Sequence, residues 1–187
     1  MEEAKIVGSG IINGGTYKNI RVAGSGKITG PIQIDDFNVA GSCVFLEDAN
    51  IKIGHASGSC RFQKDLKGNE LHFSGALTVI GETESERLHL SGRGTFNGDM
   101  NVGLLRVKTK ECVFQNVYGD HIFIESKHEQ SKVKDIEATQ IEVINVIGNR
   151  LSGDEVIVRG SSEFTVIEYR QSLELGKSVR VERIIHL

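Results

Sequence analysis

A glycine returns every 17 residues through the first half of this chain of 187 residues. Most of these glycines stand two residues after an apolar–polar–apolar triplet such as Leu88-His89-Leu90. A fixed period of this kind indicates stacked copies of one structural unit, and it outranks any local secondary-structure signal. The repeated positions are Gly24, Gly41, Gly58, Gly75 and Gly92.

The length of the unit decides its fold class. Seventeen residues are too few for two helices and a turn, which need about 33. Apolar and polar residues alternate within the unit, which is typical of strands with one buried face. The chain is therefore predicted to be all-β, a single-domain parallel β-helix with about 17 residues per coil and equivalent positions about 4.8 Å apart. We expect a right-handed coil, the usual hand of parallel crossovers.

The repeat extends beyond the glycine block in both directions, so one β-helix domain is expected over residues 1–187. Gly8 precedes the first glycine of the block by 16 residues, and triplets at Leu105 and Ile122 keep the 17-residue step after the glycine is lost. The polar and charged stretch 127–135 interrupts the pattern. We expect a loop or bulge there.

One column of large apolar residues is predicted to fill the core. Its members stand four residues after successive leading glycines and point inward if the strands alternate. They are Phe45, Phe62, Val79 and Phe96.

The positions of the three cysteines indicate buried free thiols and not a disulfide or a zinc site. Cys43 and Cys60 share one inward column, whereas Cys112 is expected outside it. Neighbouring coils would bring the first two within disulfide range. Nothing in the chain indicates secretion, so free thiols are favoured. Three cysteines without a Cys-x-x-Cys pair are poor evidence for zinc.

Three histidines form the most distinctive polar set. His55, His72 and His89 each stand three residues before a leading glycine, between inward apolar neighbours. They are predicted to form an outward, largely exposed ladder on one face. Rings on successive coils lie about 5 Å apart, whereas one zinc ion needs nitrogens about 2.1 Å from it. A solvated column is thus the favoured interpretation, with a metal site as the weaker alternative.

Composition and motifs exclude several classes of function. The formal net charge of −3 gives no basic excess to attract nucleic acid. The chain shows no N-terminal signal core and no apolar run long enough for a transmembrane segment, which predicts a cytoplasmic protein. Gly24 to Lys27 lacks the remaining residues of a phosphate loop. No catalytic pair is visible, so we expect neither a catalytic residue nor a cofactor.

The repeats resemble those of bactofilins, the polymer-forming cytoskeletal proteins of bacteria. The resemblance lies in Val22 to Gly30, in Leu90 to Asp99 and in Gly153 to Arg170. The chain departs from the common pattern in its charged break and in lacking proline-rich tails. The resemblance implies end-to-end polymerisation without nucleotide and a scaffold role in cell shape, envelope or motility. It also implies a place in the cytoplasm or at the inner face of the membrane, with other scaffold or envelope proteins as partners.

Both ends of a β-helix leave unpaired backbone and an open core, which favours self-assembly into filaments or a homo-oligomer. Two alternatives remain open: a β-helix enzyme of the carbonic-anhydrase-like or acyltransferase type, and a small protein-binding module that uses one flat face. The residues expected at the polymer interface are Ile6, Val7, Ile11 and Ile12 at one end and Val179, Val181, Ile184 and Ile185 at the other.

Overall fold

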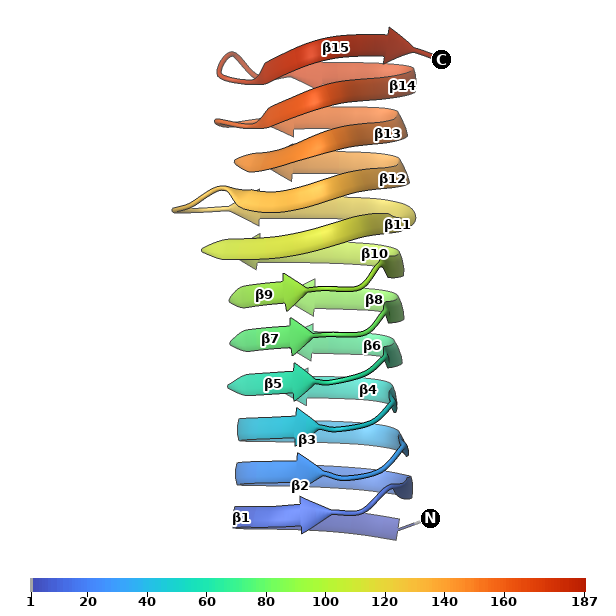
Figure 1. The fold of residues 1–187 in the computed structure, drawn as a ribbon, viewed down its shortest axis with the longest axis vertical. Helices are drawn as coiled ribbons and strands as arrows, with labels where there is room; N and C mark the ends of the chain where they lie inside the picture. Colours follow the sequence, from blue (N-terminus) through green and yellow to red (C-terminus); the bar gives the residue numbers. More distant parts are fainter. Residues whose placement is uncertain (1) are drawn as a thin grey trace.

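A computed structural model describes residues 2–187, which form a β-solenoid. About 80% of the chain is strand, and the parallel sheet makes about 11 turns of roughly 17 residues each, with no helix among the described residues. In Figure 1 the chain crosses from left to right in front and returns behind as it rises from the N- to the C-terminus. This is a right-handed coil. The all-β parallel fold and the period expected from the glycine repeat are thus confirmed.

Fifteen strands make up the sheet. The short strands β5, β7 and β9 stack in front and the longer strands β4, β6 and β8 behind, whereas β1–β3 and the strands from β11 onward continue round a corner (Figure 1). The strands are β1 (Glu2–Ile12), β2 (Gly15–Ile28), β3 (Ile32–Phe45), β4 (Ala49–Ala56), β5 (Ser59–Phe62), β6 (Leu66–Phe73), β7 (Ala76–Val79), β8 (Thr83–Leu90), β9 (Arg93–Phe96), β10 (Met100–Thr109), β11 (Glu111–Ser126), β12 (Ser131–Ile144), β13 (Val146–Arg159), β14 (Glu163–Leu175) and β15 (Arg180–His186).

The core is a set of columns parallel to the solenoid axis. Phe45, Phe62, Val79 and Phe96 are register partners on successive coils, and each side chain is at most 1% exposed. The rings of Phe45 and Phe62 stack with centroids 4.3 Å apart. Phe96 stacks in the same way on Phe114 of the next coil, at 5.1 Å. Offset stacking of this kind adds to the apolar area that each ring buries.

The repeated glycines form one column at the left-hand corner of the coil, where the backbones come very close. A Cβ added to Gly58, Gly75 or Gly92 would lie 1.9 Å from the carbonyl oxygen of the preceding glycine in the column. Gly24 and Gly41 show the same approach and also have φ angles of +127° and +139°. Only glycine lets successive coils stack through such a corner.

The column changes at Thr109, which occupies the next position. Leu88 pairs with Leu105, a step of 17, but Gly94 pairs with Cys112, a step of 18. The additional residue is accommodated at the corner, beside Lys110. It also corrects the expectation for Cys112, which joins the column of Cys43 and Cys60.

The three cysteines are free and buried. Burial raises the pKa of the Cys43 and Cys60 thiols to about 12, and that of Cys112 to about 11. Such thiols stay protonated at neutral pH and act as small apolar side chains.

The interruption predicted over 127–135 is shorter than expected. Residues 127–130 leave the sheet, and β12 already begins at Ser131. The charged residues that follow fit a strand because Lys132 and Lys134 are exposed while Val133 is buried. Ile122 pairs with Ile141, a step of 19, and the next step is 15, so the period returns to its mean.

Candidate functional site

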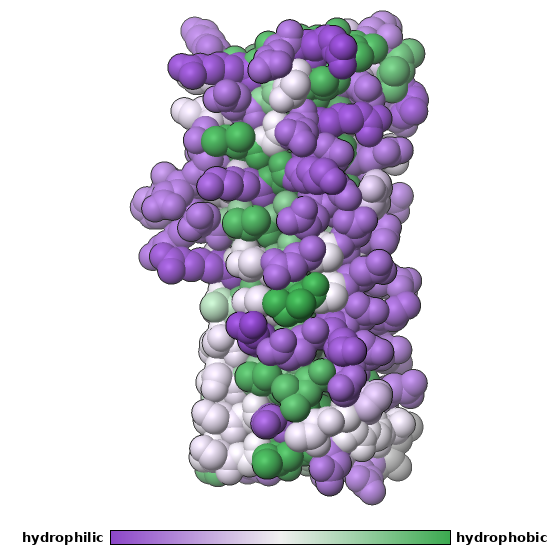
Figure 2. Space-filling view, viewed as in Figure 1, coloured by the Kyte–Doolittle hydropathy of each residue, from purple (hydrophilic) through white to green (hydrophobic). Residues whose placement is uncertain are grey.

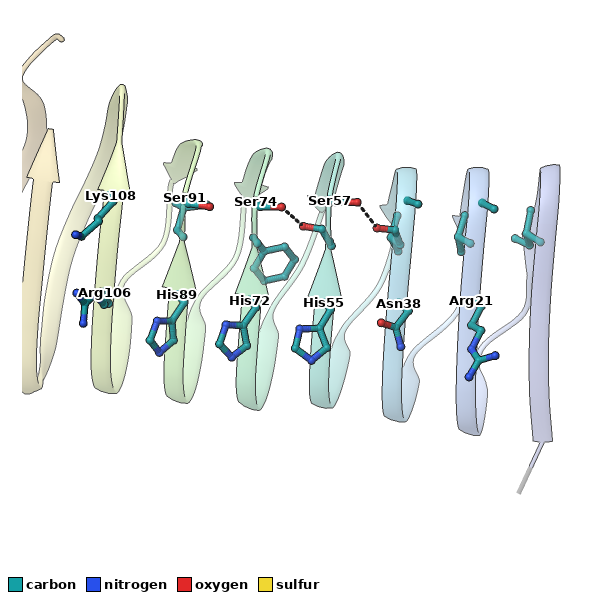
Figure 3. Close-up of a pocket in the computed structure, with 18 of the residues that line it drawn as sticks. Arg21, Asn38, His55, Ser57, His72, Ser74, His89, Ser91, Arg106 and Lys108 are labelled. Carbon is teal, nitrogen blue, oxygen red and sulfur yellow. Dashed lines mark hydrogen bonds between the residues drawn. The ribbon is translucent and has the colours of Figure 1, made fainter. Parts of the chain in front are cut away.

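A groove of about 680 Å³ runs along the solenoid axis and is lined by residues from the first seven coils. Figure 3 shows two parallel rows beside it, one of long polar side chains and one of small residues with Lys108 at its end. The groove forms because the residues of the second row are small. They stand two positions after the long residues and therefore lie on the same outward side of each strand. We call the long row the basic column; it consists of Arg21, Asn38, His55, His72, His89 and Arg106.

The three histidines stack face to face within this column. The ring centroids of His55 and His72 are 5.1 Å apart with an interplanar angle of 19°, and those of His72 and His89 are 4.7 Å apart with an angle of 13°. His55 is exposed, but His72 and His89 are half-buried. The prediction of a largely exposed ladder is therefore wrong for His72 and His89, because neighbouring side chains of the column cover part of each ring.

Parallel rings in a row cannot direct their nitrogens at one ion, because a zinc–nitrogen bond is about 2.1 Å long and the ligands must converge. Among residues 2–187 no group of three or more His, Cys, Asp or Glu side chains is placed to hold a metal ion.

Few carboxylates oppose the positive charge of this column. Glu70 lies 3.0 Å from Nε2 of His72 and forms the one ion pair of the column within the described residues. This hydrogen bond lowers the pKa of Glu70. Asp36 accepts a hydrogen bond from the side chain of Asn38 at 2.5 Å. Arg21 and Arg106 form no ion pair within the part of the chain that the structure describes, so they present positive potential to an incoming group.

The pKa of His89 is lowered, first by burial and then by the neighbouring His72 and Arg106. Because its folded-state pKa lies below the unfolded value, the neutral ring stabilises the fold above about pH 6.5, and this contribution is lost as the pH falls below that value.

We expect the substitution Arg106→Gln to raise the pKa of His89 towards its ordinary value, because it removes a like charge. Following the imidazole C–H signals by NMR across pH 4.5–8.5 would measure this. The matched control is Arg93→Gln, on a front strand away from the groove. An unchanged pKa of His89 in Arg106→Gln would contradict the electrostatic interpretation.

The interface residues predicted in the N-terminal coil fall into two groups, one buried and one exposed. Ile6 and Ile12 point inward and are only 7% and 6% exposed. Val7 and Ile11 pair with the outward positions Ala23 and Lys27 and are 73% and 69% exposed. They therefore lie on the outer wall of the first coil and not over its core, because alternate residues of a strand point to opposite faces.

At the C-terminal end the core is open. Val181 and Ile184 pair with the buried Phe164 and Ile167, yet Ile184 is 48% exposed because β15 is the last strand in the stack of the described residues. Leu175, partner of the buried Val158, is 40% exposed. Val179 is half-buried and packs against the core. Ile185 pairs with Glu168, so it points outward and is not part of the open core.

Comparisons with known protein families, curated proteins and solved structures found no match for this chain. None of the described residues belongs to a helix long and apolar enough to cross a membrane.

The sequence interpretation missed a second column, on the corner opposite the glycines. We call it the acidic column: its carboxylates recur every 17 residues at turns that precede β4, β6, β8 and β10. The 17-residue period could have revealed it. Its members are Asp48, Asp65, Glu82 and Asp99.

Proposed function

We propose that this protein is a structural protein that assembles end to end into nucleotide-independent filaments or scaffolds. The observation that carries the proposal is the open C-terminal coil, where inward apolar side chains such as Ile184 are about half exposed. Apolar atoms are visible on this top coil in Figure 2. A neighbouring molecule that covered them would remove apolar area from water and stabilise the contact.

The backbone of the end coils supports the same proposal. Within residues 2–187, β1 pairs only with β2 and β15 only with β14, so each end of this stack carries a free strand edge. Free edges invite pairing with another chain. An N-terminal edge that meets a C-terminal edge would continue the parallel stack. Because that contact joins unlike ends, it repeats without closing into a ring.

The biological role follows the resemblance of the repeats to bactofilins. We propose a cytoplasmic scaffold, including at the inner face of the membrane, that serves cell shape, envelope or motility. Its partners would be further copies of the chain and other scaffold or envelope proteins. Such a role requires neither a catalytic residue nor a cofactor.

The double variant Leu175→Lys/Ile184→Lys should shift the protein towards monomer. Two ammonium groups over the open core would have to lose water in the assembled contact, which is costly without partners. The measurement is sedimentation velocity at pH 7.5 and high salt, at equal concentrations of variant and wild type, with circular dichroism to verify folding.

A matched control is Ile53→Lys, because Ile53 is also partly exposed, at 38%, but lies on a side wall in the middle of the stack. We expect this variant to assemble like the wild type. A wild type that stays monomeric at high concentration would disprove end-to-end assembly and would favour a small binding module.

A further inference from the structure

The acidic column is an ordered row. The backbone N–H of Asp65 donates to the carboxylate of Asp48 at 3.3 Å, and the N–H of Glu82 donates to Asp65 at 2.8 Å. Asp99 accepts from the side chain of Asn116 at 2.9 Å. These bonds hold the carboxylates of Asp48, Asp65 and Asp99 at the corner, and the period of 17 residues places Glu82 in the same row. Asp48 and Glu82 remain exposed, while Asp65 and Asp99 are half-exposed.

Acidic and basic columns have the same spacing and lie on the same coils. Each carboxylate stands seven residues before a cation or imidazole, so the two rows begin and end at matching heights. The matched pairs are Asp48 with His55, Asp65 with His72, Glu82 with His89, and Asp99 with Arg106.

The two columns occupy opposite edges of the solenoid. Asp48 precedes β4, whereas His55 lies near its far end, so about 20 Å separates the rows within one molecule. The corners that bear the acidic column are on the right in Figure 1, and β4 runs from there towards the left. A surface that is acidic on one edge and basic on the other can repeat head to tail.

We propose that the groove beside the basic column binds the acidic column of a second copy of this chain, so that solenoids associate side by side with parallel axes. This contact is independent of the end-to-end contact proposed above. It uses the side walls of the lower coils and none of the residues of the open C-terminal end.

Spacing favours a second copy over a flexible acidic polymer. Rows of both columns repeat about every 4.8 Å, so two unstaggered solenoids match at every coil. An extended peptide advances about 6.7 Å between side chains on one face and would lose register within a few coils. Among the residues that line the groove, the second row is small, with Ala23, Ala40, Ser57, Ser74 and Ser91, so the groove has room for side chains of a second copy. In Figure 2 the left edge of the lower coils is pale, whereas hydrophilic residues dominate the upper coils.

Association should strengthen as the pH falls, because each imidazole that gains a proton adds positive charge opposite the carboxylates. Within one molecule, His72, Arg106 and Arg87 oppose protonation of His89, and Glu70 favours it. On the acidic corner, Lys64 and Lys67 are already engaged by Glu47 at 4.0 Å and Glu84 at 2.7 Å. Carboxylates of a second copy would therefore add the missing negative charge beside the histidines.

The test uses the full chain with Leu175→Lys/Ile184→Lys as background, so that end-to-end contacts do not contribute. Sedimentation velocity at pH 5.5 and low salt should show reversible association that is lost at pH 7.5 or in high salt. Asp65→Asn/Glu82→Gln keeps the hydrogen-bond acceptors and should weaken association at pH 5.5 about tenfold. Glu129→Gln/Glu163→Gln, in coils beyond both columns, has the same net charge and should behave like the background.

Charge reversal gives the sharpest result. Asp65→Lys/Glu82→Lys alone and His72→Glu/His89→Glu alone should each fail to associate, whereas an equimolar mixture should associate, also at pH 7.5. Circular dichroism verifies that each variant folds. Equal association of the acidic-column variant and its control, or a mixture that stays monomeric, would overturn the proposal. Binding of poly-glutamate to a chain that never self-associates would also overturn it, because the groove would then accept an acidic polymer.

Discussion

Gly75→Ala should destabilise the protein by more than about 3 kcal/mol or prevent folding. Its new Cβ would lie 1.9 Å from the carbonyl oxygen of Gly58. That oxygen cannot move freely, because it accepts a backbone hydrogen bond from Ala76 at 2.8 Å. The two coils would have to separate locally, which would break sheet hydrogen bonds on both sides of the corner.

The measurement is the free energy of unfolding in urea. Gly176→Ala is the matched control, because its Cβ would have 3.3 Å to the nearest atom, the Cα of Arg159. We expect that control to cost at most about 1 kcal/mol. Near-equal stability of Gly75→Ala and wild type would show that the corner can relax and that glycine is not required there.

A repair variant tests the mechanism of the corner. At Thr109 a side chain is tolerated at a corner that has gained one residue, since the step from Gly94 to Cys112 is 18 and returns to 17 only at Val117. Gly92→Thr with a lysine inserted directly after it copies that arrangement. It should recover part of the stability that Gly92→Thr alone loses. Failure of the insertion to help would mean that the additional residue at this corner serves another purpose.

Phe62→Ala should cost about 3–5 kcal/mol, the range for removing a buried phenylalanine. The ring is fully buried, stacks on Phe45 at 4.3 Å and meets Phe73 edge-on at 6.3 Å. A solenoid core is narrow, so few other side chains can move into the cavity.

Urea unfolding again gives the measurement, with Arg61→Ala as control. Arg61 is the preceding residue of β5 but is exposed, so its truncation should change stability by less than about 0.5 kcal/mol. Similar losses for both variants would contradict the assignment of Phe62 to the inner column.

The repeated glycines and the alternation of apolar residues determined the fold class, the period and the inward column from Phe45 to Phe96. These features are local and periodic, so a step of 17 residues maps directly onto stacking of one coil on the next. The same reasoning placed His55, His72 and His89 in one outward row, since residues between two inward neighbours must point out.

Deviations from the 17-residue period could be located only in the tertiary structure. One additional residue beside Lys110 moved Cys112 into the column of Cys43 and Cys60. Residues 131–135 joined a strand because their lysines face solvent. Single insertions are invisible in a pattern that tolerates coils of several lengths, but they change the register locally. The step is 18 from Gly94 to Cys112 and returns to 17 from Met100 to Val117.

The sequence by itself determined a right-handed stack of β coils and the residues that line it, because period and alternation act along the chain. Only the tertiary structure decided which of those residues are accessible. It directed Val7 and Ile185 to the outer wall, left Ile184 exposed over an open core, and set a groove beside the histidines. Exposure depends on what the neighbouring coil covers, and at the ends of a stack a coil has a neighbour on one side only.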